Sequence, residues 1–319
     1  PGISYQMAKS IVRQNVLNRA QEEDEFIKKN NIQTRFYLDD DYPNRLKYCD
    51  DSPVLLFGKG DFDWNPKKIL SIVGTRNSTS YGHKNVHIFV NGLKETGVYI
   101  VSGMAYGIDI TAHRAALKNG LPTIAVVAHG LDRLYPAIHH STLEKMLENG
   151  GVITEFLSKT TPDRENFPKR NRIIAGLSDA TLVVESGKKG GSMITADIAL
   201  SYARDVFAIP GDLGKLFSEG CNYLIHTQKA NLARGPEDIL KVMNWLKKTK
   251  KKSIQKSLFL ELTEQESLIF SELNKNGAMA IDQLSLNIGL PISKTSVNLL
   301  NMEFKGIVSA LPGKMYALV

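Results

Sequence analysis

The chain has 319 residues, of which 42% are hydrophobic and 23% are charged, and its formal net charge is +7. This length allows two or three domains with cores of their own, and no apolar run approaches the roughly 20 residues that span a bilayer. No segment has the pattern of a signal peptide, and the two cysteines, Cys49 and Cys221, lack the spacing of a metal site. We therefore expect a cytoplasmic protein with free thiols and no membrane contact.

Positive charge is concentrated in the middle of the chain. Residues 66–246 carry 21 basic and 16 acidic side chains, and residues 247–258 carry six lysines and no acidic residue. The flanking residues 1–65 and 259–319 are both net negative. This distribution favours a polyanionic partner such as nucleic acid, although a solvated surface followed by a charged linker explains the same charges.

The first 65 residues give the weakest patterns. Helical spacing over 7–16 and 22–29, in a chain that starts with Pro1 rather than Met, leads us to interpret residues 1–35 as a short helical N-terminal remnant. Between Phe36 and Gly60, an acidic cluster and two prolines predict irregular chain with one short strand at 54–57.

Residues 36–246 are expected to form an α/β domain, because from Lys67 onward apolar strands alternate with helical segments. The strands are expected at 69–73, 98–102, 123–128, 152–155, 181–185 and 206–209, and the helices at 86–93, 108–118, 141–149, 168–177, 193–203 and 237–246. The near-continuous aliphatic strands predict a parallel sheet that is buried on both faces. Such a sheet binds ligands at the carboxyl ends of its strands, where the glycine-rich loops of this chain all fall.

Residues 247–258 are polar and basic without periodicity, so we interpret them as a linker. A capping box at Thr263 to Glu266 begins the first of three helices, and the others are expected at 281–288 and 293–304, the last with Val297, Leu300 and Phe304 on one face. A hairpin over 307–319 completes a winged helix in residues 259–319. Because this domain is net acidic, a protein-interaction or structural role is favoured over duplex contact.

The loop at 74–82, GTRNSTSYG, places one arginine among glycine and small hydroxyl residues. A guanidinium can bind a phosphate while hydroxyl groups, backbone N–H groups and the positive end of the following helix contact the other oxygens. The candidate residues are Gly74, Arg76, Ser78, Ser80 and Gly82, and a structural salt bridge of Arg76 is the alternative. The loop has neither GxGxxG nor the Walker A pattern, which disfavours a nicotinamide dehydrogenase and an ATPase.

The second loop contributes Ser102 and Gly103 as candidates and leads into a helix with Asp109 and His113 four residues apart. This spacing puts both side chains on one face, where they suit a metal or acid/base chemistry. Since there is no third ligand and no paired nucleophile, we favour a helix cap at Asp109 and a hydrogen-bonded His113.

Two further loops contain more lysine and arginine residues than the first two loops. One begins a helix near Asn166 and Pro168 and offers phosphate contacts and an aromatic surface for a base, with the candidates Arg164, Phe167, Lys169, Arg170, Asn171 and Arg172. The alternative places Phe167 in the core and the arginines in surface ion pairs. The other loop precedes the helix at 193–203 and offers close backbone approach to an anion, with the candidates Lys188, Lys189, Gly190, Gly191 and Ser192.

Together these motifs resemble the DNA-processing protein A family, also called DprA or Smf. The matching runs are GTRNSTSYG (74–82), SGMAYGIDITAH (102–113), FPKRNRIIAGLS (167–178), LVVES (182–186) with GGSMITA (190–196), and AIPGD (208–212) with GCNYLIH (220–226). They agree in order and spacing over roughly residues 36–240, and the winged helix fits the family too. The departures are at the ends, since the N-terminal segment is short and winged helices vary within the family.

The resemblance implies a Rossmann-like domain that binds single-stranded DNA, forms a homodimer, protects incoming strands during natural transformation and helps to load the RecA recombinase. By position in the motifs, Arg76, Arg164, Phe167 and the loop 190–192 become strand-binding candidates. We expect no catalysis, no metal and no cofactor.

A second function class remains open, because the domain also resembles the Rossmann-like nucleotide phosphoribohydrolases, which carry a PGGxGTxxE signature. Aligning Gly191 and Ser192 with the Gly-Thr of that signature puts Thr195 where the glutamate should stand, so the expected acid/base or stabilising group is missing. A winged-helix regulator of duplex DNA with a ligand-sensing domain is the third hypothesis.

Overall fold

The structure is a computed structural model that describes residues 4–12, 16–246 and 262–319, with only the backbone of residues 10–12. The linker expected at 247–258 lies outside the described residues. Two N-terminal helices, α1 (Tyr5–Val12) and α2 (Leu17–Lys29), begin earlier than the sequence pattern predicted. No described helix has the length and the apolar composition that crossing a membrane requires.

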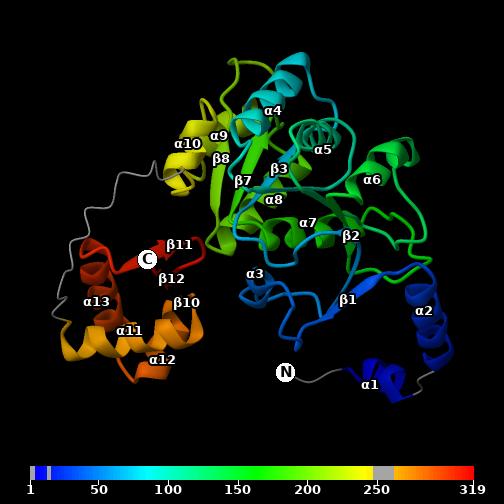
Figure 1. Cartoon of the computed structure of the whole chain (residues 1–319). Coiled ribbons are helices and arrows are strands. Elements are labelled where there is room, and N and C mark those ends of the chain that lie inside the picture. The colour runs from blue at the N-terminus through cyan, green and yellow to red at the C-terminus, as the bar shows by residue number, and fades with distance from the viewer. Residues whose placement is uncertain (1–3, 13–15, 247–261) are drawn as a thin grey trace.

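A nine-stranded sheet organises the larger part of the described chain (Figure 1). Its strands are β1 (Gln33–Phe36), β2 (Leu55–Asp61), β3 (Ile69–Gly74), β4 (Tyr99–Ser102), β5 (Thr123–Val126), β6 (Gly150–Thr154), β7 (Ala180–Val184), β8 (Asp205–Ala208) and β9 (Asn231–Leu232). They lie in the order β1-β2-β6-β5-β4-β3-β7-β8-β9. All neighbours from β6 to β9 are parallel, whereas β1 and β2 form an antiparallel edge. The predicted α/β class with a mostly parallel sheet is therefore confirmed.

Helices cover both faces of this sheet, as the aliphatic strands require. One face packs against α4 (Ser80–Gly92), α5 (Ile108–Lys118) and α10 (Pro236–Val242), with α6 (His140–Met146) and a short 3₁₀ turn (Ala137–His139) beside α5. The other packs against α3 (Asn44–Lys47), α7 (Asn166–Leu177), α8 (Gly191–Ser201) and α9 (Glu219–His226). Within the central strand β3 the one polar residue, Ser71, is fully buried and donates from its hydroxyl to Thr181 Oγ1 at 2.8 Å. The buried hydroxyl is thereby satisfied.

The strand order reverses direction between β3 and β7. Successive strands β3, β4, β5 and β6 lead toward one edge, whereas β7, β8 and β9 lie on the opposite side of β3. The loops that leave β3 and β7 therefore turn to opposite faces of the sheet and open a crevice between them, the usual ligand position in such folds.

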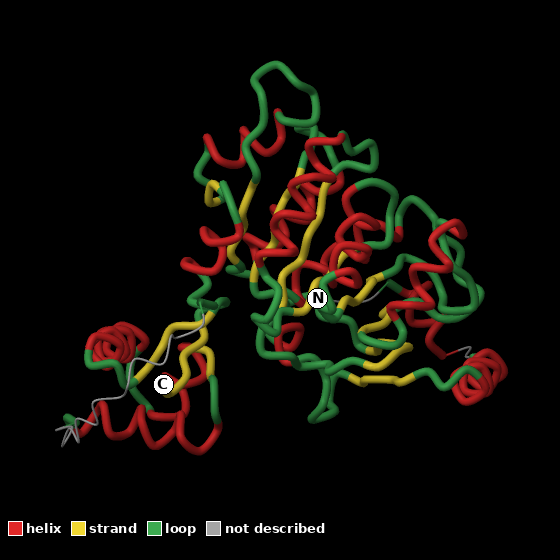
Figure 2. The backbone as a smooth tube through the Cα atoms, turned by 45° about the horizontal axis from the view of Figure 1, so that its top comes forward, coloured by secondary structure: helices red, strands yellow, loops and turns green. Residues whose placement is uncertain are grey.

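The C-terminal part is a winged helix, seen beside the larger part in Figures 1 and 2. It contains α11 (Glu264–Asn276), β10 (Met279–Ala280), α12 (Ile281–Ile288), α13 (Ile292–Phe304), β11 (Val308–Leu311) and β12 (Met315–Leu318). The predicted capping box is present, since Thr263 Oγ1 accepts from the Glu266 amide at 3.3 Å and Glu266 Oε2 from the Thr263 amide at 2.9 Å. Arg204, which belongs to the larger part, donates from Nη1 to the Pro312 carbonyl at 3.4 Å.

Several features of these elements differ from the sequence pattern. β1 and α3 lie in or beside the stretch that was expected to be irregular, and α9 was not predicted. On α13, Val297, Leu300 and Phe304 do share a face, but they are 59%, 51% and 82% exposed. The core side of α13 is instead formed by Thr295, Leu299 and Met302. Apolar spacing marks a helix face without indicating which face the neighbouring elements cover.

Candidate nucleic-acid interface

A cavity of about 690 Å³ opens at the carboxyl ends of β3 and β7. All four predicted loops meet in its wall, namely the loops after β3 and β7, the start of α7, and the loop after β4 through Ala105 and Asp109. The candidate residues that line it are Gly74, Arg76, Phe167, Arg170, Asn171, Lys188, Lys189, Gly190, Gly191 and Ser192. Leu216, Phe217 and Glu219 also line the cavity. Parallel strands bring these loops together although they are about 100 residues apart in sequence.

Phe167 lies among positively charged groups at this cavity. The Cζ atom of Arg76 is 5.0 Å from its ring centroid and that of Arg170 is 5.9 Å away. Tyr135 approaches the same ring at 6.4 Å between centroids. The ring is partly buried and Arg76 is exposed. A partly covered aromatic face beside an exposed guanidinium offers both parts of a nucleotide a contact.

The loop that carries Arg76 is held in place by Glu185, at the end of β7. The Glu185 carboxylate accepts from the Thr79 amide at 2.8 Å and from the Thr79 hydroxyl at 2.5 Å, and its carbonyl accepts from the Thr75 amide at 2.8 Å. Glu185 has a positive φ of 53° and is 7% exposed. It was not a sequence candidate, although a lone acidic residue ending an apolar strand was the available signal. Gly82 leaves room for this carboxylate, since a Cβ there would lie 2.1 Å from Glu185 Oε2.

Arg170 lies in the cavity wall but is 4% exposed. Its Nη1 donates to the Gly103 carbonyl at 2.6 Å and to the Val126 carbonyl. Burial lowers its pKa to about 10, against the raising influence of Asp109, so it stays charged at neutral pH. It therefore braces the loop after β4 while adding positive potential to the cavity.

Asp109 and His113 are both buried on α5. Asp109 accepts from the Ala105 amide at 3.3 Å, and burial raises its pKa despite the nearby charge of Arg170. His113 Nδ1 is 2.7 Å from the hydroxyl of Thr123, which itself donates to the Ile100 carbonyl. The histidine must therefore be the donor in that contact. Burial lowers the pKa of His113 to about 3, so the ring is neutral.

The loop before α8 presents Lys188 and Lys189 as exposed side chains. Gly190 precedes the first helical residue, Gly191, whose added Cβ would meet nothing within 4 Å. Ser192 Oγ is turned inward and donates to Ser186 Oγ at 2.7 Å. The helix start therefore offers its backbone N–H groups and the positive end of its dipole to an anion in the cavity.

Comparison with known proteins decides the family. A family model described as DNA recombination-mediator protein A matches residues 33–244, and one described as DprA winged helix domain matches residues 260–314. The chain belongs to the DNA recombination-mediator protein A family. The predicted DprA/Smf resemblance and the predicted winged helix are thereby confirmed.

Two relatives are DNA processing protein DprA of Streptococcus pneumoniae and protein Smf of Escherichia coli. The first is 42% identical over 203 residues, which cover 64% of this chain and 71% of the relative. The second is 42% identical over 200 residues, which cover 62% of this chain and 53% of the relative. The match thus spans between about half and seven tenths of these relatives' lengths.

Two solved structures agree with this family. DNA processing protein A of S. pneumoniae superposes with a TM-score of 0.63 at 38% identity, covering 68% of this chain and 77% of that one. The Helicobacter pylori protein, described for its single-stranded DNA binding mode, gives a TM-score of 0.60 at 28% identity and covers 67% of this chain and 95% of that one.

The remaining candidates from the family motifs lie outside the cavity wall. Ser78 Oγ contacts His83 Nε2 at 3.0 Å, and Ser102 is buried and donates to the Ile72 carbonyl at 2.6 Å. Arg172 forms an ion pair with Glu155 and donates to the Asp51 carbonyl. The others are Ser80, Arg164 and Lys169, which are exposed, and Gly82 and Gly103, which are buried. Only the exposed members of this set are accessible to a ligand that extends beyond the cavity.

The cavity also bears on the enzyme alternative. Thr195, at the position where the hydrolase signature has glutamate, is 2% exposed and bonds from its hydroxyl to the Gly191 carbonyl at 3.3 Å. The carboxylates in the wall are Asp109 and Glu219. Across the described ranges, no group of three or more His, Cys, Asp or Glu side chains is arranged to hold a metal ion.

Proposed function

We propose that this chain binds single-stranded DNA along the cavity at the ends of β3 and β7. The observation that carries the proposal is the contact between Arg76 and Phe167, in which the Cζ atom lies 5.0 Å from the ring centroid. Both residues lie in the wall of a cavity that the start of α8 also lines. Membership of the family supports it, as does the description of the H. pylori relative.

In this proposal the phosphates contact Arg76, Lys188, Lys189 and the N–H groups at the start of α8, while Arg164 and Lys169 extend the basic surface outside the cavity. A base stacks on Phe167, which contributes about 1–3 kcal/mol. Paired bases in a duplex have their faces covered by neighbours, so they are excluded from this ring. The binding is therefore selective for single strands with little dependence on base identity.

The wider role is also part of the proposal and follows from the family resemblance. We infer that the protein forms a homodimer, protects incoming strands in natural transformation and loads a RecA-type recombinase, all within the cytoplasm. We infer no catalysis, since Thr195 replaces the carboxylate of the hydrolase signature. The winged helix would serve a protein contact or a structural role, because α13 exposes apolar residues and few basic ones.

The test is fluorescence anisotropy of a labelled oligothymidine with Arg76→Ala and Phe167→Ala. The loss of stacking predicts that Phe167→Ala raises Kd about 5- to 150-fold. Arg234→Ala is the matched control, since Arg234 is exposed and pairs with Asp238 outside the cavity. If both cavity variants bind like the unmodified protein, strand binding in this cavity is wrong. Release of free base from nucleoside monophosphates, abolished by cavity substitutions, would support the hydrolase alternative instead.

A further inference from the structure

Helix α2 lies outside residues 33–244, yet it contains a buried carboxylate that bonds to the larger domain. Glu23 is 6% exposed and accepts from the Ser158 amide at 3.0 and 3.1 Å and from the Ser158 hydroxyl at 2.6 Å. Arg19 Nη2 lies 2.6 Å from both Glu23 Oε2 and the Ser158 carbonyl. Ser158 is therefore bound at its amide, its hydroxyl and its carbonyl by two residues of one helix.

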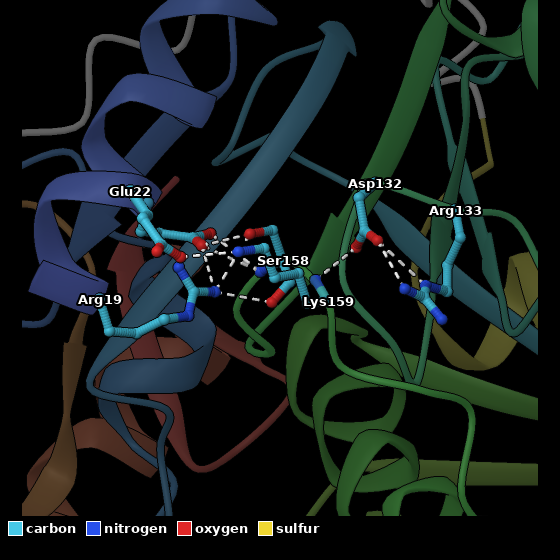
Figure 3. A network of polar contacts seen from close by, with 7 residues as sticks. Arg19, Glu22, Asp132, Arg133, Ser158 and Lys159 are labelled. Atoms are coloured by element: carbon cyan, nitrogen blue, oxygen red, sulfur yellow. Dashed lines mark hydrogen bonds and ion pairs between the residues drawn. The ribbon is translucent and has the colours of Figure 1, made fainter. Parts of the chain in front are cut away.

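The next residue, Lys159, is held from two sides, as Figure 3 shows. Its amide donates to Asp132 Oδ1 at 2.7 Å, and its ammonium group contacts Glu22 Oε2 at 2.7 Å. Lys159 has a positive φ of 69°, a conformation that a non-glycine residue holds only when its surroundings fix it.

Ser158 and Lys159 belong to the segment that leads into α7, where Phe167 lies. The Gly130 amide donates to the Thr160 carbonyl at 3.1 Å, and Asn166 Nδ2 donates to the Thr161 carbonyl at 3.2 Å. Asn166 is the first residue of α7, and Phe167 is the second. The loop that contains Asp132 also leads to Tyr135, whose ring contacts that of Phe167. Residues 160–166 and the loop that contains Asp132 and Tyr135 both lie next to Phe167, and both are connected to Ser158 and Lys159.

The bonds to Glu23 favour its charged form. Burial acts to raise the pKa of Glu23, but hydrogen bonds from Ser158 and Arg19 outweigh this and hold the pKa below its usual value. A buried carboxylate that accepts this many bonds leaves several groups unsatisfied when it is removed.

We propose that Glu23 is a positioning residue for the DNA-binding cavity, which fixes Ser158 and thereby holds the start of α7, with Phe167, in its binding position. Glu23 contacts no part of the cavity wall itself. The proposal rests on the strand-binding function above, and it assigns to α2 a role in affinity that the family match does not cover.

The experiment compares Glu23→Gln with Asp24→Asn in the full chain. Asp24 is the adjacent residue on α2 and forms an exposed ion pair with Lys28 at 2.6 Å, so it is the matched control. We expect Glu23→Gln to raise Kd for labelled oligothymidine at least about fivefold and to speed amide hydrogen exchange in residues 157–167 about tenfold, with exchange in β3 and β7 unchanged. Asp24→Asn should change neither.

Ser158→Ala provides a second variant in case Glu23→Gln fails to fold, since it removes only the hydroxyl contact. It should raise Kd about two- to threefold. If Glu23→Gln and Ser158→Ala both bind like the unmodified protein while Phe167→Ala binds weakly, the positioning role is wrong and strand binding stands. If Phe167→Ala and Arg76→Ala also bind normally, the proposed function itself is wrong.

Discussion

The hydroxyl of Thr79 donates to the carboxylate of Glu185 at 2.5 Å, although 106 residues separate them in sequence. This contact joins the loop after β3 to the end of β7 across the point where the strand order reverses. The loops on the two sides of the cavity are therefore coupled to one another by this bond, and loosening it should affect stability and binding together.

Breaking this contact from either side should have the same consequence. Thr79→Val removes the hydroxyl that bonds to Glu185 and also caps α4 through the Tyr81 amide at 3.2 Å. We expect it to lower the free energy of unfolding by about 1–2 kcal/mol and to weaken strand binding. A double-mutant cycle with Glu185→Gln in urea denaturation should give a coupling energy of at least about 0.5 kcal/mol. Additive effects of the two substitutions would contradict the coupling.

Alanine substitution of two glycines in the cavity wall should affect different properties, the stability for Gly74 and the DNA affinity for Gly191. A Cβ on Gly74 would lie 2.0 Å from the Val184 carbonyl oxygen, which belongs to the sheet backbone and cannot move away. Gly74→Ala should therefore lower the free energy of unfolding by about 3 kcal/mol, the upper end of the range for overpacking. Gly191→Ala meets no protein atom within 4 Å, so unfolding should be unchanged while oligothymidine affinity falls. Normal binding by a folded Gly191→Ala protein would argue against close approach of the strand at α8.

The salt dependence of binding should distinguish the phosphate contacts from base stacking. Phosphate contacts release counterions, so the logarithm of the binding constant should fall linearly with the logarithm of salt concentration. Arg76→Ala should reduce this slope by about 0.7, the value for one phosphate contact on a single strand. Phe167→Ala should weaken binding at every salt concentration with the slope retained, because stacking releases no counterion. Equal slopes for Arg76→Ala and the unmodified protein would mean that Arg76 contacts no phosphate.

Stability should fall in mildly acidic solution because of His113. Burial lowers its pKa to about 3 in the folded protein, whereas in the unfolded chain its pKa is the usual 6.5. Between these values the unfolded chain binds the extra proton, so stability is lost as the pH falls below 6.5, by at most about 1.4 kcal/mol per pH unit. His129 and His139 are shifted in the same direction by burial.

The measurement is the free energy of unfolding in urea at several values from pH 7 to pH 5, above most carboxylate titrations. His113→Leu should be less stable overall, since the Thr123 contact is lost, but its stability should depend less on pH over this interval. An unchanged pH dependence in His113→Leu would show that this histidine is not the group responsible.

The sequence predicted the sheet better than the surface of the site. Strands such as β3 and β7 were evident because a strand buried on both faces is almost continuously aliphatic. β9, with two exposed residues at the sheet edge, gives no such signal. The convergence of Arg76, Phe167 and the loop before α8 also followed, because the carboxyl ends of parallel strands share one edge.

What the sequence did not predict was the direction of individual side chains. Arg170 and Arg172 stand two residues apart, yet Arg170 is buried in the cavity wall and Arg172 pairs with Glu155. Helical spacing separates their directions by about 200°, and only the packing of α7 determines which direction faces the cavity. Glu185 was missed for a similar reason, since its role depends on Thr79, which is distant in sequence.

The contact between Arg76 and Phe167 has a consequence for how firmly a strand is retained. In the unbound protein the guanidinium occupies part of the ring surface, and this contact is worth about 0.5–1 kcal/mol at an exposed site. An arriving base exchanges that contact for a stacking energy of about 1–3 kcal/mol. Stacking of a base is therefore opposed by the loss of this contact, and the arginine can cover the ring again when the base leaves. Such an exchange favours rapid turnover of individual nucleotides at this ring.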